Sequence, residues 1–179
     1  HIIVHYEEDT YRVASHIQTR GSIPLLWTQT PTLKYAPKLE IEEDESKSKS
    51  AAQKHFDPKI KKYGKHVLIN LIDKKGSQLK IGKAFTNLVQ DLGNDQIFYE
   101  WFDFHAECAK MKYENLSILI EHINEEVEKQ DYFMAKLDYA FDQKEKLGKS
   151  TCMVMLNQNG VCKTNCMDCL DRTNVVQSV

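Results

Sequence analysis

Long hydrophobic runs are missing from this sequence of 179 residues, and the apolar stretches are each only a few residues long. This excludes a transmembrane helix within the chain. A basic and apolar leader is missing as well, so the opening HIIVHY predicts a strand rather than a signal peptide. An excess of one charge sign is also missing, because the formal net charge is -2. The chain as a whole therefore has no electrostatic attraction to nucleic acid, and we expect no nucleic-acid partner.

An even set of cysteines and an initiator methionine are the other absences. The five cysteines are an odd number in a chain that is long enough to bury a core, which argues against a disulfide framework and favours a reducing compartment. The chain begins at His1 and stops at Val179, soon after the start of an expected helix. We therefore expect a fragment, truncated at both ends, of a longer protein.

Alternation of apolar strands and amphipathic helices is the main pattern that is present. The run His66–Ile72 is almost continuously apolar and predicts a strand that is buried on both faces. Apolar residues then recur at helical spacing between Ser77, an expected N-cap, and Gly93, an expected C-terminal glycine. The aromatic segment Ile97–Phe104 predicts a second strand, and an apolar stripe over 116–127 predicts a second helix. We expect an α/β fold with a mixed sheet flanked by helices.

The polar segments lead to weaker expectations. The charged, serine-rich run Glu40–Ser50 predicts a solvated loop, and Asp131–Ser150 predicts a surface excursion. Thr151–Leu156 reads as a strand, and Asn157–Gly160 contains an Asn-Gly turn signal. This predicts a hairpin that returns along Val161–Thr164 and delivers the chain to Cys166.

The segment KTNCMDCLDRTNVVQS, residues 163–178, carries the chemistry. Five residues separate Cys166 from Arg172, and Thr173 follows. A loop of this length between a strand and a helix can direct its backbone N–H groups towards a phosphate. The same field favours a thiolate at the start of the loop, and the planar fork of an arginine matches two phosphate oxygens. This pattern predicts a phosphate-binding loop at 166–172, placed between a strand and a helix.

Three kinds of chemistry are compatible with these residues. In the first, Cys166 is the nucleophile of a phosphatase, Arg172 and the loop amides hold the equatorial oxygens, and Thr173 assists the departure of sulfur; this needs no metal or other cofactor. In the second, cysteines bind zinc, because Cys152, Cys162, Cys166 and Cys169 lie within 18 residues. In the third, Cys166 and Cys169 form a redox pair, which leaves the Arg-Thr that follows without a role.

The motif resembles the signature of the Sac-domain phosphoinositide phosphatases, which continues Cys-Met-Asp-Cys-Leu-Asp-Arg-Thr-Asn after Arg-Thr-Asn or Arg-Ser-Asn. Further similar segments are TRGSIPLLWTQTPTLKYAP, HFDPKIKKYGKHVLINLIDKKGS, FDFHAEC and LSILIEHI. The resemblance covers most of the chain and is closest to the membrane-anchored branch of the endoplasmic reticulum and Golgi. It implies that residues 1–179 are part of a Sac catalytic domain. It also implies removal of phosphate from inositol lipids, chiefly phosphatidylinositol 4-phosphate and other monophosphates, at the cytosolic face of a membrane.

The resemblance implies roles for individual residues. Cys166 corresponds to the nucleophile and Arg172 to the phosphate clamp. Asp168 and Asp171 are the candidates for the general acid, because a carboxylate beside a bound phosphate holds its proton more readily. Either aspartate can instead orient Arg172 or cap the helix. Loop residues expected to contact the substrate are Met167, Cys169 and Leu170, together with Lys163 before the loop.

Departures from the family pattern and an alternative role complete the interpretation. Lys163 stands where the family usually has an arginine, which keeps the charge and loses bidentate geometry. Ala135–Lys149 has the character of an insertion. A catalytically silent lipid-binding or scaffold module is the alternative, although Cys166, Arg172 and Thr173 are all present. Outside the motif, Asp103 and His105 are expected to cap a helix, and Arg20-Gly21-Ser22 lies either near the site or in a structural turn.

Overall fold

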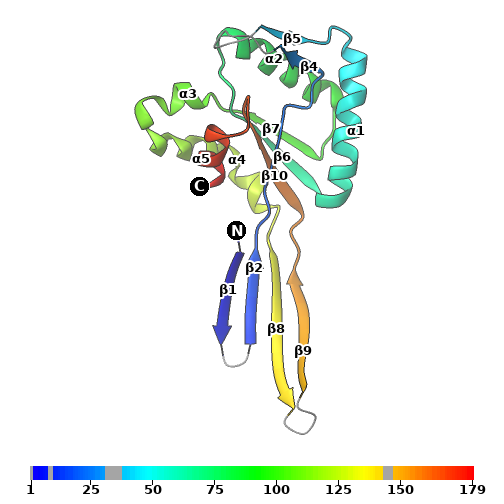
Figure 1. Cartoon of the computed structure of the whole chain (residues 1–179), viewed down its shortest axis with the longest axis vertical. Helices are drawn as coiled ribbons and strands as arrows, with labels where there is room; N and C mark the ends of the chain where they lie inside the picture. The colour runs from blue at the N-terminus through cyan, green and yellow to red at the C-terminus, as the bar shows by residue number, and fades with distance from the viewer. Residues whose placement is uncertain (1, 8–9, 31–37, 143–146) are drawn as a thin grey trace.

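The computed structural model describes residues 2–7, 10–30, 38–142 and 147–179, and it contains two four-stranded sheets. One sheet has the order β3-β10-β6-β7 and only parallel pairs. Its strands are β3 (Thr19–Arg20), β10 (Gly160–Asn165), β6 (Lys65–Asn70) and β7 (Ile97–Trp101). Helices cover this sheet, so the expected α/β class is confirmed (Figure 1).

The helices divide between the two faces of the parallel sheet. The longer helices are α1 (Glu45–Tyr63), α2 (Gly76–Leu92) and α4 (Leu116–Glu128), and α5 (Asp171–Gln177) follows the motif. Short helical turns, α3 (Phe104–Glu107), η1 (Ala109–Met111) and η2 (Tyr113–Asn115), link β7 to α4. Apolar residues of α1 and α2 pack in one cluster, and those of α4 pack in another.

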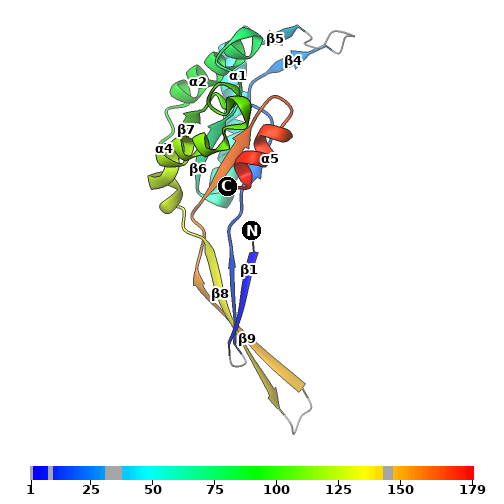
Figure 2. The same ribbon diagram turned by 90° about the vertical axis from the view of Figure 1, so that its left-hand side faces the viewer.

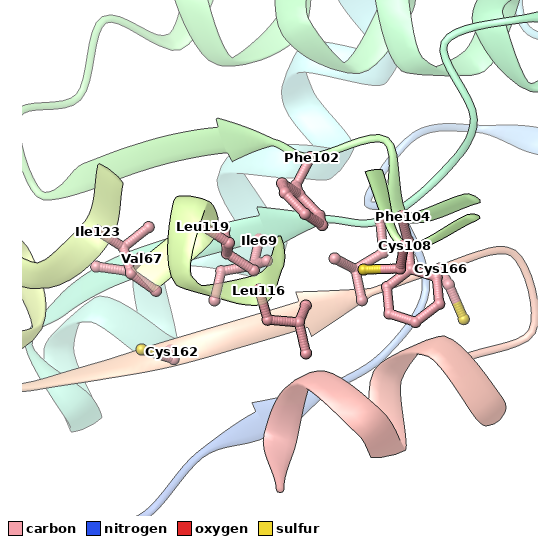
Figure 3. Packing of buried hydrophobic residues seen from close by; sticks show 11 residues of the cluster. Val67, Ile69, Phe102, Phe104, Cys108, Leu116, Leu119, Ile123, Cys162 and Cys166 are labelled. Carbon is pink, nitrogen blue, oxygen red and sulfur yellow. The ribbon is translucent and has the colours of Figure 1, made fainter. Parts of the chain in front are cut away.

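Strand β6 is buried on both faces, as its continuous apolar run predicted. Its side chains alternate between the two clusters, because successive residues of a strand point to opposite faces. Val67 and Ile69 pack with Leu119 of α4, whereas Leu68 packs with Phe85 of α2. Figure 3 shows the first of these clusters, in which Cys162 and Cys166 of the motif region also lie.

The second sheet is antiparallel and has the order β1-β2-β8-β9. Its strands are β1 (Ile2–Glu7), β2 (Thr10–Ser15), β8 (Phe133–Asp142) and β9 (Leu147–Leu156). Figures 1 and 2 show it as a long ribbon that extends away from the α/β part. The surface excursion expected over 131–150 consists of strands: its described residues include all of β8 and the start of β9, while 143–146 lie outside the described residues.

The hairpin expected around Asn159-Gly160 is also wrong. Strand β9 pairs with β8, and β10 enters the parallel sheet between β3 and β6. Residues 157–159 link the two sheets, and the glycine is needed for a close approach: a Cβ at Gly160 would lie 2.6 Å from Cγ of Gln130 and 2.7 Å from the carbonyl oxygen of Lys65. The glycine at 160 is therefore explained by its close packing against Gln130 and Lys65, and not by a hairpin turn.

The run Glu40–Ser50, expected as a solvated loop, is largely ordered into secondary structure. β5 (Leu39–Ile41) pairs with β4 (Trp27–Gln29), and α1 begins at Glu45. Asp44 caps this helix, since its Oδ1 accepts a hydrogen bond of 3.0 Å from the N–H of Ser46. The charged residues belong to an exposed helix start.

Helix α2 has the C-terminal cap that the sequence predicted, because Gly93 adopts the left-handed conformation with φ 54°. Its N-cap is Lys75 rather than the expected Ser77, which lies inside the first turn. Among the described helices, none combines the length and the apolar composition needed to cross a bilayer.

Candidate functional site

The motif lies where the parallel sheet ends. Strand β10 is entirely buried, and its last residue, Asn165, donates from Nδ2 to Oδ1 of Asn70 on β6 at 2.7 Å. The carbonyl oxygen of Asn165 accepts from the N–H of Leu71 at 2.9 Å. The chain then forms the loop from Cys166 to Leu170 and enters α5 at Asp171. This confirms the expected order of strand, loop and helix, at the edge where α/β proteins gather functional residues.

Cys166 is held inside this loop and is only 1% exposed. The hydroxyl of Thr173 donates to its Sγ at 3.3 Å, and Thr173 itself is fully buried. The thiol in turn lies 3.2 Å from Oδ1 of Asp168, to which it donates. The structure therefore brings together three of the residues that the sequence assigned to catalysis: Cys166, Asp168 and Thr173.

Asp168 organises the loop from within. Its Oδ1 also accepts a hydrogen bond of 3.1 Å from the N–H of Leu170. The hydrogen bonds from Leu170 and from the thiol of Cys166 lower the pKa of the Asp168 carboxyl below its ordinary value. In this arrangement Asp168 is ionised at neutral pH and does not hold the proton that a general acid must donate. Asp171 is exposed in the first turn of α5, and the choice between the two aspartates stays a prediction.

The other loop residues occupy different environments. Met167 packs against the apolar cluster beneath α1 and α2, whereas the side chain of Leu170 is 56% exposed. Cys169 has a positive φ of 57° and directs its Sγ at the carbonyl oxygen of Cys166, 3.8 Å away. A left-handed conformation is unusual for a non-glycine residue, so neighbouring contacts must stabilise it.

Arg172 is bound to residues outside the loop. Its Nη1 donates to the carbonyl oxygen of Leu71 at 3.1 Å, to Oδ1 of Asp73 at 3.2 Å and to Oε1 of Gln78 at 3.2 Å. Oδ1 of Asp73 also lies 2.8 Å from Nδ1 of His105. The guanidinium thus shares a carboxylate with an imidazole at the edge of the sheet, close in the fold to the loop that follows β10.

Asp73 and Gln78 were missed as neighbours of Arg172 from the sequence. The available signal was the position of Asp73 directly after the buried run His66–Ile72, because polar residues at the carboxyl ends of parallel strands gather at one edge. The cap predicted for Asp103 is confirmed, since its Oδ1 accepts from the N–H of Ala106 at 3.1 Å. The same role for His105 is wrong, because its imidazole contacts Asp73.

Lys163 lies on β10 and is 3% exposed. Its Nζ donates to the carbonyl oxygens of Ser22 at 3.1 Å and Gly21 at 3.5 Å. Burial, and to a smaller extent the charge of Lys59, lowers the pKa of Lys163 to about 8. The ammonium therefore anchors the main chain after β3, and its expected contact with substrate stays a prediction.

The cysteines of the zinc alternative occupy separate places. Cys152 is exposed on β9 of the antiparallel sheet, while Cys162 is buried and its Sγ lies 3.7 Å from Oε1 of Gln130. Burial raises the pKa of the Cys162 thiol to about 11, which disfavours the thiolate that zinc requires. Within the described ranges, no three His, Cys, Asp or Glu side chains are grouped as a metal site would need.

Comparison with known proteins gives consistent matches. Residues 1–109 match the family model described as SacI homology domain. Over 93% of the present chain, the sequence is 43% identical to Phosphatidylinositol-3-phosphatase SAC1-A of Danio rerio. It is 38% identical to Phosphatidylinositol-3-phosphatase SAC1 of Saccharomyces cerevisiae over 97%, and 39% identical to Phosphoinositide phosphatase SAC7 of Arabidopsis thaliana over 93%. It spans 26% of the length of each of these three relatives.

Proposed function

The chain belongs to the SacI homology domain family, and from this premise we propose that it is the part of a phosphoinositide phosphatase that carries the nucleophile. The reaction is hydrolysis of a phosphate monoester on the inositol ring of a membrane lipid. One observation carries the proposal: Cys166 is buried at the start of a five-residue loop, with the hydroxyl of Thr173 directed at its sulfur. A structural cysteine would not need this hydroxyl or the arginine that follows the loop.

In the proposed first step, the thiol of Cys166 passes its proton to Asp168, to which it already donates at 3.2 Å, and the resulting thiolate attacks phosphorus in line with the bond to the inositol oxygen. The sulfur–phosphorus bond forms, the phosphorus–oxygen bond breaks, and the departing oxygen takes a proton from a general acid. Asp168 and Asp171 both remain candidates for this acid: Asp168 is in contact with the thiol of Cys166 and can pass on the proton that it takes from sulfur, and Asp171 lies in the first turn of α5. Loop amides and Arg172 stabilise the charge on the equatorial oxygens.

In the proposed second step, water attacks the phosphocysteine and releases inorganic phosphate. The sulfur leaves as a thiolate, which is stabilised by the hydroxyl hydrogen of Thr173 at the 3.3 Å contact already present. Arg172 must leave its contacts with Asp73 and Gln78 to reach a phosphate in the loop. We propose that the substrate's negative charge draws it there, since an arginine binds two phosphate oxygens at once.

The proposed substrates are phosphatidylinositol monophosphates presented by a membrane, including phosphatidylinositol 4-phosphate. The names of the zebrafish and yeast relatives specify the 3-phosphate, and the name of the plant relative specifies no position. We therefore propose the monophosphate class and not a single ring position. The proposed location is the cytosolic face of the endoplasmic reticulum or Golgi, on the basis of family resemblance.

One observation favours the alternative of a catalytically silent lipid-binding module, namely that Arg172 is engaged by Asp73. Phosphate release separates the two functions. The full-length protein is incubated with vesicles that contain phosphatidylinositol 3-phosphate or 4-phosphate, in the presence of a metal chelator. We expect release from at least one lipid and none from Cys166→Ser, while Cys152→Ser, an exposed cysteine on β9, retains activity. Binding without release by the wild type would favour the silent module, and loss of activity in the chelator would contradict a metal-free reaction.

A further inference from the structure

Arg20 lies beside the strand that leads into the loop, and the main chain around it is held in place. It ends β3, which pairs with β10 in parallel through Thr19 with Lys163 and Arg20 with Thr164. The N–H of Gly21 donates to the carbonyl oxygen of Thr164 at 3.4 Å. The buried ammonium of Lys163 donates to the carbonyl oxygens of Gly21 and Ser22, the two residues after Arg20. The main chain on both sides of Arg20 is therefore fixed against the strand that leads into the loop.

From this fixed position the guanidinium of Arg20 reaches the outside of the loop. Its Nη2 donates to the carbonyl oxygen of Leu170 at 3.3 Å and to that of Cys169. Its Nη1 donates to Oδ1 of Asn174 on α5 at 2.5 Å. One rigid, planar side chain thus joins the edge strand, two consecutive loop carbonyls and the helix that follows.

Contacts with carbonyl oxygens on the outside determine what the loop presents on the inside. In a trans peptide, the C=O of one residue and the N–H of the next point in opposite directions. Fixing the carbonyls of Cys169 and Leu170 therefore fixes the N–H groups of Leu170 and Asp171. The first of these donates to Oδ1 of Asp168, the same oxygen that contacts Sγ of Cys166, so it is directed towards the side of the loop where the sulfur lies.

The contacts of Arg20 also include the loop residue with the least favourable backbone conformation. Cys169 has φ 57°, a conformation that a non-glycine residue adopts only when its surroundings impose it. The carbonyl of this residue is one of the two that Arg20 holds. The exposed position of Arg20 means that the arginine is not required to fill the core.

We propose that Arg20 is a positioning residue that braces the loop from outside, so that the N–H groups of Leu170 and Asp171 face the phosphate. This inference rests on the proposed function of the loop. Arg20 does not itself touch the substrate. From the sequence, the Arg20-Gly21-Ser22 segment was expected either near the site or in a structural turn. The proposal gives it a role at the site.

The test uses the full-length protein with Arg20→Ala, Arg20→Lys and, as a matched control, Arg12→Ala, another exposed arginine that lies on β2 of the antiparallel sheet. Two quantities are measured: the kinetics of phosphate release from vesicles, and hydrogen exchange of a peptide that spans residues 166–172. In Arg20→Ala we expect kcat to fall roughly 10- to 100-fold with a smaller change in KM, because the loop amides are misplaced. We expect faster exchange at Leu170 and Asp171.

The remaining variants sharpen the test. Arg20→Lys should be intermediate, because an ammonium lacks the planar fork. Guanidinium ion at low concentration should partly restore kcat and slow exchange in Arg20→Ala, and should have no such effect on Arg12→Ala. A role limited to general stability would not respond in this way.

Two results would overturn the proposal: unchanged kcat together with unchanged exchange in Arg20→Ala, or a lower kcat with unchanged exchange, which would mean that the arginine contacts the substrate. If the wild type releases no phosphate from any inositol lipid, the proposed function fails separately. The exchange measurement then decides alone: faster loop exchange in Arg20→Ala supports the brace, and unchanged exchange refutes it.

Discussion

Burial of Lys163 predicts a pH dependence of stability that can be isolated by substitution. The side chain is 3% exposed, and its ammonium contacts two carbonyl oxygens rather than a carboxylate. Burial is the larger cause of a pKa that is lowered from 10.5 to about 8, and Lys59 adds to the effect. Because charge is disfavoured in the folded state, the free energy of unfolding must increase once this lysine loses its proton.

The sign and the size follow from the two pKa values. Below pH 8 the lysine is protonated in both the folded and the unfolded chain, and the cost of the buried charge is constant. Between pH 8 and 10.5 the unfolded chain binds more protons, so the free energy of unfolding rises with pH. One pKa unit corresponds to about 1.4 kcal/mol, which gives a total rise of roughly 3 kcal/mol for the shift from 10.5 to about 8.

Urea unfolding at a series of pH values between 7 and 11 measures this rise. Lys163→Arg is the matched control, because an arginine keeps its charge throughout this range and other titrating groups cancel in the difference. We expect the free energy of unfolding of the wild type to increase relative to Lys163→Arg between pH 8 and 10.5. Parallel curves for the two proteins would refute the assignment of a buried ammonium without a carboxylate partner at this position.

Two further predictions concern the approach to the loop and the chemistry within it. Gly160→Ala should lower the free energy of unfolding by about 1–3 kcal/mol in urea, because the added Cβ meets the carbonyl oxygen of Lys65 at 2.7 Å. Gly21→Ala is the control, since its Cβ would meet nothing within 4 Å, and an equal loss in both would contradict the steric argument. Thr173→Val should slow hydrolysis of the phosphocysteine on the order of 10²-fold by removing the hydrogen bond to sulfur. Rapid-quench kinetics should then show a burst of dephosphorylated lipid before slow phosphate release, and a uniform slowing without a burst would count against this role.

The parallel sheet and its helices could be predicted because their signals are local. The continuous apolar run in β6, the periodicity of α2 and α4 and the glycine at 93 each report on a few neighbouring residues. The loop between β10 and α5 was predicted for the same reason, since the motif is contiguous in the sequence.

The wrong hairpin and the wrong role of His105 concern partners that are distant in the sequence. The loop expected over Glu40–Ser50 and the cap expected at Ser77 were wrong for a local reason, because polar residues are common both in loops and at helix starts. An Asn-Gly pair between two strand-like segments is typical of a hairpin, yet β9 pairs with β8 and β10 with β6. Which neighbour a strand chooses depends on the whole sheet, and a turn signal does not report it. The sequence of β8 does alternate, with apolar residues at every odd position from Phe133 to Phe141 and the charged residues Lys136, Asp138 and Asp142 at even positions. The expectation of a surface excursion rested on the polar composition of the segment and did not use this period-2 signal.

In the candidate site, too, contacts within the motif could be predicted, and contacts with distant residues could not. Residues within the motif, Cys166, Asp168 and Thr173, were predicted and lie together. Arg172 and Lys163 were predicted as charges, but their contacts with Asp73 and with Ser22 lie 99 and 141 residues away in the sequence. Spacing within a motif cannot show such contacts, and they determine where these side chains point.

Direct labelling of the nucleophile tests the central claim. The full-length protein is mixed with vesicles that contain phosphatidylinositol monophosphate labelled with ³²P on the ring phosphate, quenched in acid and digested. The account predicts label on the peptide that contains Cys166, none in Cys166→Ser, and more in Thr173→Val, where breakdown of the intermediate is slowed. Phosphate release without label on Cys166, or label that persists in Cys166→Ser, would contradict it.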